Sequence, residues 1–202
     1  FMSPRFTGDR ANFAPYDDGN SFSTPVQDFV SQFEAADTRI APTFFDMEAY
    51  VAQNPSVTFD IRNEYTGYYN HKYMVYQESN LPDLRITHGN NYRAIRYADV
   101  LLMAAEANLQ ASVQKNNPQD LLDLVRDRAF GNTNNRIPAT MQNVLQERRL
   151  ELGGEGHRFF DQVRTGQTST IPGFMNNKNE VFPIPRIEIE LAGNRWEQNS
   201  NY

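Results

Sequence analysis

The chain has 202 residues, with 19 Lys and Arg against 25 Asp and Glu and a formal net charge of −6. Nucleic acid rewards a basic protein surface, so no nucleic-acid partner is expected for this acidic chain. The sequence contains no cysteine, which excludes disulfides, thiolate metal sites and a cysteine nucleophile. Composition and periodicity indicate a mainly helical globular domain and say nothing more about its function.

The first part of the chain is expected to be largely irregular. Residues 1–23 are rich in Gly, Asn, Asp and Pro and show no apolar period. A helix is predicted to begin after them, with Thr24 as its N-cap and Pro25 at its first position. This part of the chain is therefore read as loops with one early helix.

An extended region is predicted over residues 56–76. Val57, Phe59 and Ile61 alternate with polar residues, as in a half-buried strand, and one short β-hairpin follows from this pattern. Aromatic residues make up 12% of the chain, and many of them lie before residue 80. Two interpretations of these aromatics stay open: ordinary packing under long loops, or platforms for a ligand.

The rest of the chain is predicted to be helical. An apolar stripe marks a helix of about 18 residues through Ile95, Ala98, Leu102, Ala105 and Leu109. The next helix is predicted to begin at Asn117 and Pro118 and to stop at Gly131. Small residues on both helices favour a close antiparallel pair, about one helical repeat in size, and such a unit needs stacking partners.

Two further helices are predicted after this pair. Thr140 is expected to cap the third helix, which Gly153 and Gly154 should break. A short fourth helix is expected to run from about Gly156 to Arg164.

The charged block over residues 147–161 admits three interpretations. Its acids and His157 resemble part of a metal site, but Glu155 and His157 are two residues apart, whereas a di-iron bundle needs Glu-x-x-His. Glycoside hydrolysis needs a general acid, and the interleaved arginines would lower the pKa of each carboxyl group. The favoured interpretation is a structural ion-pair network of Glu147, Arg148, Arg149, Glu151, Glu155, His157, Arg158, Asp161 and Arg164.

A second charged set lies on the first helix of the pair. Arg93, Arg96 and Asp99 follow each other at spacings of three residues. An ion-paired or solvated helix face is favoured here over a ligand site.

Several motifs resemble those of the SusD/RagB family, in the order in which the family has them. Residues 93–107 resemble the family's R-x-x-R-Y-A-D-V-L-L-x-x-A-E-A helix, and residues 121–129 resemble its L-N-x-V-R-x-R-A segment. The charged block up to Gly166 resembles its E-R-R-x-E-L-x-x-E-G-x-R-x-x-D-L-x-R-x-G signature. Shorter matches occur in Asp37 to Arg39, in Phe182 to Pro185 with Glu188, and in Gln198 and Asn199 with Tyr202. Gly153 and Gly154 depart from the family pattern and are expected to affect local packing.

The resemblance implies a mainly α SusD-like fold with a TPR-like helix pair, long irregular loops and a short β-hairpin. Residues 1–202 correspond to the C-terminal half of a SusD/RagB-like domain. The N-terminal half, with the remaining TPR-like helices, a signal peptide and a lipidated Cys, is expected to lie outside this chain and to be one of its partners.

The resemblance also implies a function. Such proteins are similar to surface-exposed, lipid-anchored proteins of the outer membrane that bind glycan or oligosaccharide and deliver it to a SusC-like TonB-dependent transporter. No enzyme activity, cofactor or metal is expected. The alternatives are a peptide-binding protein, a purely structural transporter lid and, less favoured, a glycoside hydrolase.

Aromatic rings that stack on sugars, with polar neighbours that reach hydroxyl groups, are the expected ligand contacts. The candidates lie before residue 24: Phe13, Tyr16, Asp17, Asp18, Asn20 and Phe22. They match no family motif. The run Asp17 to Asn20 is also compatible with a turn or a weak structural Ca²⁺ loop, although it lacks the EF-hand spacing.

Overall fold

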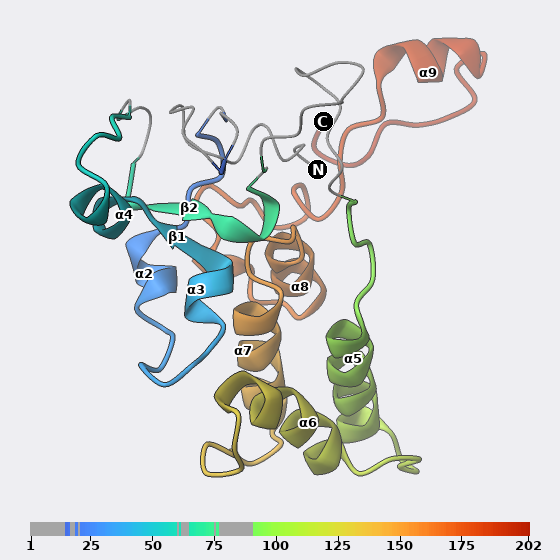
Figure 1. The fold of residues 1–202 in the computed structure, drawn as a ribbon. Coiled ribbons are helices and arrows are strands. Elements are labelled where there is room, and N and C mark those ends of the chain that lie inside the picture. Colours follow the sequence, from blue (N-terminus) through green and yellow to red (C-terminus); the bar gives the residue numbers. More distant parts are fainter. Residues whose placement is uncertain are drawn as a thin grey trace. The chain divides into compact units, whose positions relative to one another are not determined.

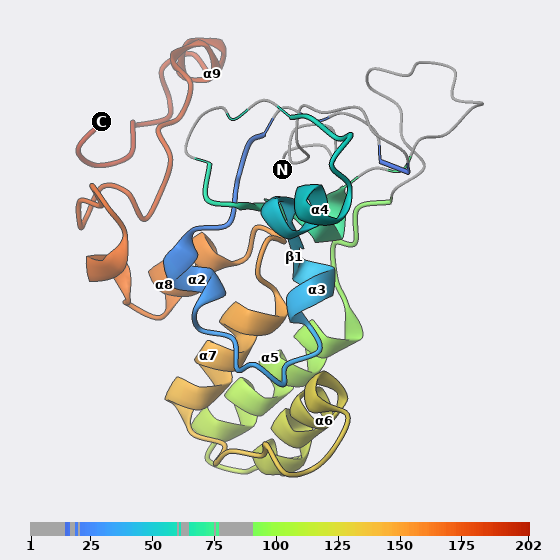
Figure 2. The same cartoon turned by 60° about the vertical axis from the view of Figure 1, so that its left-hand side comes forward.

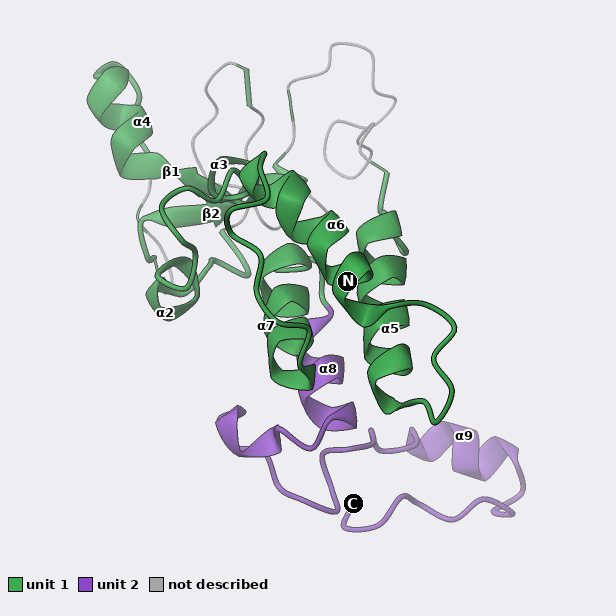
Figure 3. Ribbon diagram, turned by 90° about the horizontal axis from the view of Figure 1, so that it is seen from below, with its two compact units in different colours: residues 1–156 green, residues 157–202 purple. Residues whose placement is uncertain are grey.

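The computed structural model describes residues 15, 16, 19, 21–59, 61, 65–74, 76 and 91–202. The chain divides into two compact units, residues 1–156 and residues 157–202, and each is described by itself (Figure 3). The elements of the first unit are α2 (Gln27–Val30), α3 (Ile40–Thr43), β1 (Phe44–Asp46), α4 (Met47–Gln53), β2 (Tyr68–Asn70), the 3₁₀ turn η1 (His71–Tyr73), α5 (Tyr97–Gln110), α6 (Pro118–Phe130) and α7 (Met141–Glu151) (Figure 1).

Helices α5, α6 and α7 pack together around one apolar core (Figure 2). Each helix contributes to this core, which consists of Leu101, Leu102, Ala105, Leu122, Val125 and Val144. The predicted helix pair is confirmed. The predicted start and end of the second helix are also confirmed, because the Asn117 side chain accepts a hydrogen bond from the Gln119 amide and Gly131 ends the helix with φ 68°. The first helix begins later than predicted, because Arg96 is extended at the N-cap and Ile95 before it is 70% exposed.

The predicted start of the early helix is wrong. Helix α2 is four residues long, and its N-cap is Val26 rather than Thr24. Phe29 from α2 and Phe33 after it pack edge to face on each other and on Phe44. This small apolar cluster, more than helix capping, therefore places α2.

The small sheet differs from the predicted hairpin. Strands β1 and β2 are antiparallel, with Phe45 opposite Tyr69, but residues 47–67 with α4 connect them instead of a tight turn. The strand predicted over Val57, Phe59 and Ile61 is wrong. Val57 and Phe59 are partly buried against a largely aromatic cluster, so their alternation reflects packing beneath a loop. This cluster consists of three aromatic residues and two methionines: Tyr16, Phe45, Tyr69, Met47 and Met74.

Two glycines turn the chain sharply after α7, which ends at Glu151, just before the glycines that are predicted to break it. A Cβ on Gly153 would lie 2.2 Å from the Phe29 ring. Gly154 has φ 78°, and its carbonyl oxygen accepts a hydrogen bond of 2.8 Å from the Asn70 side chain. The turn is therefore clamped between α2 and β2, and only glycine fits at both positions.

The second unit contains α8 (Arg158–Arg164), the 3₁₀ turn η2 (Thr168–Thr170) and α9 (Arg186–Leu191). Helix α8 confirms the predicted fourth helix, whereas α9 had no sequence signal. Two C-terminal motifs contact each other here, because the Gln198 side chain makes hydrogen bonds to both the amide and the carbonyl of Ile184, each 2.8 Å long. Within the described part of the chain, no helix combines the length and the apolar character that a membrane span requires.

Candidate functional site

The charged block forms the centre of an ion-pair network in the first unit. Glu147, on α7, is buried between two arginines from distant parts of the chain. Arg39 Nη1 lies 2.6 Å from one carboxylate oxygen, and Arg126 Nη1 lies 2.7 Å from the other. Asp37 holds Arg39 from the opposite side, at 2.7 Å. Every charge at this point is therefore buried and matched, which is the arrangement that buried ions require.

The network continues one helical turn later through Glu151 and Glu155. Arg96 lies between the two carboxylates, with Nη1 at 2.9 Å from Glu151 and Nε at 2.7 Å from Glu155. Lys72 Nζ donates to the Glu155 carboxylate at 2.7 Å and to the Glu151 carbonyl oxygen at 2.8 Å. Arg128 also pairs with Glu151. The turn at Gly153 brings Glu155 back to the end of α7, so that one arginine binds both acids.

The protonation states follow from burial and pairing. Burial alone would raise the pKa of Glu151, but Arg128 and Arg96 lower it, and the net shift is downward. The pKa of Glu155 is likewise lowered, because Arg96 and Lys72 outweigh burial. For Lys72 burial is the larger effect, and its pKa is lowered despite Glu155. Both acids are therefore carboxylates at neutral pH and cannot supply a proton.

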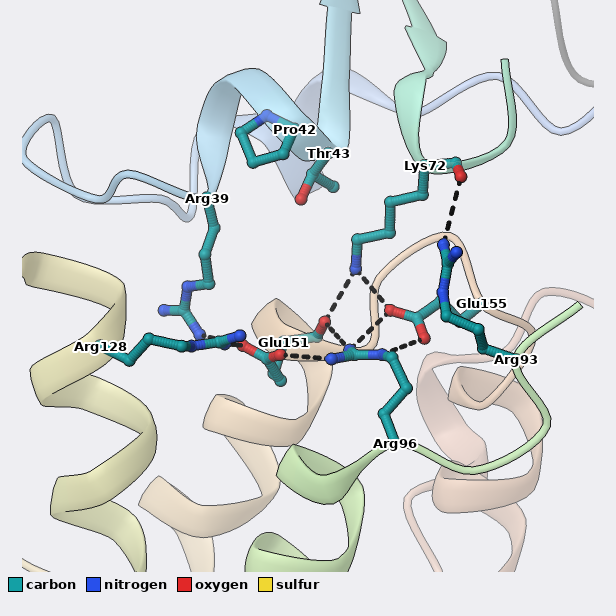
Figure 4. A pocket seen from close by; sticks show the side chains of 9 residues that line it. All are labelled: Arg39, Pro42, Thr43, Lys72, Arg93, Arg96, Arg128, Glu151 and Glu155. Atoms are coloured by element: carbon teal, nitrogen blue, oxygen red, sulfur yellow. Dashed lines mark hydrogen bonds and ion pairs between the residues drawn. The ribbon is translucent and has the colours of Figure 1, made fainter. Parts of the chain in front are cut away.

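A cavity of about 280 Å³ opens beside this end of the network (Figure 4). Five cationic side chains line it: Arg39, Lys72, Arg93, Arg96 and Arg128. The remaining lining comes from Glu151 and Glu155 and from Pro42 and Thr43 on α3. Cations therefore outnumber carboxylates in the wall of the cavity.

The other residues of the charged block have separate partners. Arg148 Nη1 pairs with Asp99 at 2.7 Å. Arg149 lies 3.5 Å from Asp28 and also stands over the Phe29 ring. In the second unit Asp161 and Arg164 pair locally on α8, at 2.6 Å.

Two further members of the predicted network need separate comment. Contrary to expectation, the His157 side chain makes no ion pair or hydrogen bond with any residue that the structure describes. Its backbone carbonyl oxygen accepts a hydrogen bond of 3.0 Å from the Asp161 amide at the start of α8. Arg158 is the first residue of α8. Within the described ranges no group of three or more His, Cys, Asp or Glu is arranged to hold a metal ion.

The predicted ligand residues are only partly described. Phe13, Asp17, Asp18 and Asn20 lie outside the described residues. Tyr16 is buried in the aromatic cluster, with its ring 5.0 Å from Phe45 and 5.1 Å from Tyr76 between centroids. Burial and the neighbouring Tyr76 raise the pKa of Tyr16 to about 12. Phe22 is exposed, as an aromatic platform would be.

Sequence reasoning found the acids of the network but missed most of their partners. Arg39 and Asp37 were noted only as a family motif, and Lys72 carried no signal. Arg39 lies 108 residues from Glu147 along the chain, so no helical period relates the two. The ion-paired face predicted for Arg96 and Asp99 is confirmed, since both residues bind charges of the block.

Comparison with known proteins gives a consistent result. The model of the SusD family matches residues 6–183. SusD-like protein P38 of Formosa agariphila is 26% identical, over 88% of this chain and 40% of that protein. SusD-like protein P2 of the same organism is 26% identical, over 55% of this chain and 26% of its own length. The chain thus spans less than half the length of these relatives.

Solved structures extend the similarity to the whole chain. Surface glycan-binding protein A from Bacteroides thetaiotaomicron, in complex with laminarihexaose, has a TM-score of 0.87 and 27% identity, and the match covers 98% of this chain and 46% of that one. The corresponding protein of Bacteroides fluxus has a TM-score of 0.84 and 28% identity, with 98% and 45% covered.

Proposed function

Since the chain belongs to the SusD family, we propose that it is part of a cell-surface protein that binds glycan and passes it to a SusC-like TonB-dependent transporter. The observation that carries this proposal is the similarity to a surface glycan-binding protein in complex with laminarihexaose. The same similarity supports a place at the cell surface, and we propose that a lipid anchor holds the whole protein at the outer membrane. The transporter is the partner that we propose for the whole protein.

The described aromatic residues suggest where glycan binds in this chain. A sugar ring stacks on an exposed aromatic face, and the ring of Tyr16 is enclosed by protein side chains. Tyr76 forms a β-bridge with Tyr16, and its own side chain is 52% exposed. Tyr76 and Phe22 therefore replace Tyr16 as the ring platforms that we propose.

The charge pattern favours binding over catalysis. A glycoside hydrolase needs one protonated carboxyl group and a second carboxylate across the substrate. The buried acids of the network are bound by arginines, and the pKa of Glu151 and Glu155 is lowered. We therefore propose that the protein is not an enzyme.

The helix pair has a face that suits a further helical segment of the same protein. Tyr97, Val100, Met103 and Leu124 are exposed on α5 and α6. Tyr97 and Leu124 also line a groove of about 350 Å³, together with Ala98, Leu101 and Val125 and with Arg96 and Arg128, which border the cavity of Figure 4 as well. A TPR-like repeat needs a neighbour to bury its second face, so we propose that the N-terminal half of the domain covers these residues.

Affinity electrophoresis of the full-length protein against a panel of glycans tests the binding function. At least one glycan should retard the wild-type protein, and Tyr76→Ala should weaken retardation by about tenfold, which corresponds to ~1.4 kcal/mol. The control is Tyr202→Ala, since Tyr202 lies in the second unit and bonds the Val181 carbonyl. No retardation by any glycan, with transporter association intact, would favour a structural lid. Release of reducing sugar would favour an enzyme.

A further inference from the structure

None of the proposed glycan platforms lines the cationic cavity of the first unit. We propose that the cavity between α3, η1 and the end of α7 binds a small organic carboxylate, of the class that includes sugar acids. The proposal rests on the charges, free donors and size of this cavity, and it holds whether or not the protein binds neutral glycan.

Charge makes the cavity selective for an anion. Its walls carry five cationic side chains and two carboxylates. Both carboxylates are already saturated by cations at distances of 2.7 to 2.9 Å. Asp37 and Glu147 compensate Arg39 from outside the cavity, and Arg126 in turn compensates Glu147. Arg126 also pairs with the more exposed Glu34 at 3.0 Å. The network with the cavity walls thus holds six cations and five carboxylates, which leaves a net positive charge for a ligand.

Hydrogen-bond donors remain available at the cavity. Lys72 has three N–H donors, and residues of the described part of the chain accept two of them. Arg128 uses one of its nitrogens on Glu151, and its side chain is 54% exposed. Arg93 makes one weak hydrogen bond, of 3.4 Å, to the Lys72 carbonyl oxygen. A carboxylate between these side chains would accept charge-assisted hydrogen bonds from more than one of them.

Thr43 adds a neutral donor. Its side chain is directed from α3 into the space between Arg39 and Lys72 (Figure 4). Although Thr43 is buried, its hydroxyl group has no hydrogen-bond partner among the residues that the structure describes. An oxygen-rich ligand would satisfy this hydroxyl group together with the free N–H donors.

Size and electrostatics limit the ligand further. A volume of about 280 Å³ lies just below the ~300 Å³ at which pockets for small molecules begin. The cavity therefore suits a single small acid rather than an oligosaccharide. An anion here would also oppose the effect of burial, which lowers the pKa of Lys72. Binding is thus expected to weaken with rising salt concentration.

Titration calorimetry on the full-length protein tests the proposal, with sodium glucuronate, sodium acetate and glucose as separate probes. We expect saturable binding of at least one of the two acids and none of glucose. Arg93→Gln and Arg128→Gln should each weaken this binding at least tenfold. Both arginines are exposed, so these variants should fold, which circular dichroism and thermal melting check.

The matched control is Arg186→Gln, which removes the same charge from a side chain that is 92% exposed in the second unit. Its affinity for the acid should equal that of the wild type. Stronger binding of glucuronate would assign the cavity to sugar acids, and stronger binding of acetate would assign it to plain organic acids. The proposal is overturned if neither acid binds saturably, if Arg93→Gln and Arg128→Gln bind the acid as tightly as the wild type, or if Arg186→Gln weakens binding as much as Arg128→Gln.

Discussion

The two ends of the ion-pair network contain the same kinds of residue and differ in what surrounds them. At the closed end, Glu147 and its partners Arg39 and Arg126 are all buried. At the open end, Glu151 and Glu155 are buried just as deeply, but Arg128 is 54% exposed and borders a cavity. The accessibility of the cations, more than that of the acids, therefore separates a structural ion pair from a surface that can bind a ligand.

The largest expected effect is at the closed end. Glu147→Gln leaves Arg39 and Arg126 buried without their shared counter-charge. Loss of one partner from a buried pair costs ~3–5 kcal/mol, so the free energy of unfolding should fall by about that amount. Urea denaturation of the full-length protein measures it.

Glu190→Gln is the control for this variant. Glu190 pairs with Arg186 on the surface of α9, where both side chains are more than half exposed. Its loss should change the free energy of unfolding by less than ~1 kcal/mol. Equal losses in the two variants would contradict the special role of the closed end.

The next effect concerns the turn that joins the two ends. Gly153→Ala places a Cβ 2.2 Å from the nearest carbon of the Phe29 ring if neither residue moves. Such overpacking costs ~1–3 kcal/mol, which thermal and urea unfolding should detect. The double variant Gly153→Ala with Phe29→Leu should recover part of this loss. If the two losses simply add, the contact is not the cause.

Acid should affect the open end. The pKa of Glu151 and of Glu155 is lower in the folded protein than in the unfolded chain. The stability that these acids contribute is therefore fully present above the unfolded pKa, near 4.5, and is lost as the pH falls through the folded values. Arg128 lowers the pKa of Glu151, so in Arg128→Gln the loss should begin at a higher pH. Urea denaturation at a series of pH values from 3 to 7 measures this loss. A free energy of unfolding that falls over the same pH range in Arg128→Gln and in the wild type would contradict the prediction.

The smallest expected effect is that of Arg128→Gln on stability at pH 7. Solvent screens an exposed cation, and Glu151 keeps Arg39 and Arg96 as partners. The free energy of unfolding should fall by less than ~1 kcal/mol, far less than in Glu147→Gln. A loss of the same size in both variants would remove the distinction between the two ends.

The sequence predicted the helices of this molecule better than its long-range contacts. Helix α6 carries its own signals in Asn117 and Gly131, because capping is local chemistry. Strand β1 at Phe44 had no such signal. Strand β2 at Tyr68 lies within the predicted extended region, but its partner could not be predicted, since strand pairing depends on packing between distant segments. The acids of the network were visible for the same reason as the helices, because Glu147 and Glu151 share the period of α7. Lys72 and Arg39 reach them only through the fold.

We propose that the charged block is a structural ion-pair network and that glycan binds elsewhere on the protein. The most direct test is the glycan affinity of folded Glu147→Gln, measured by affinity electrophoresis at a temperature where circular dichroism shows the variant to be native. We expect its affinity for glycan to lie within about twofold of the wild type, although its free energy of unfolding is much lower. A well-folded Glu147→Gln protein that no longer binds any glycan would contradict the proposal.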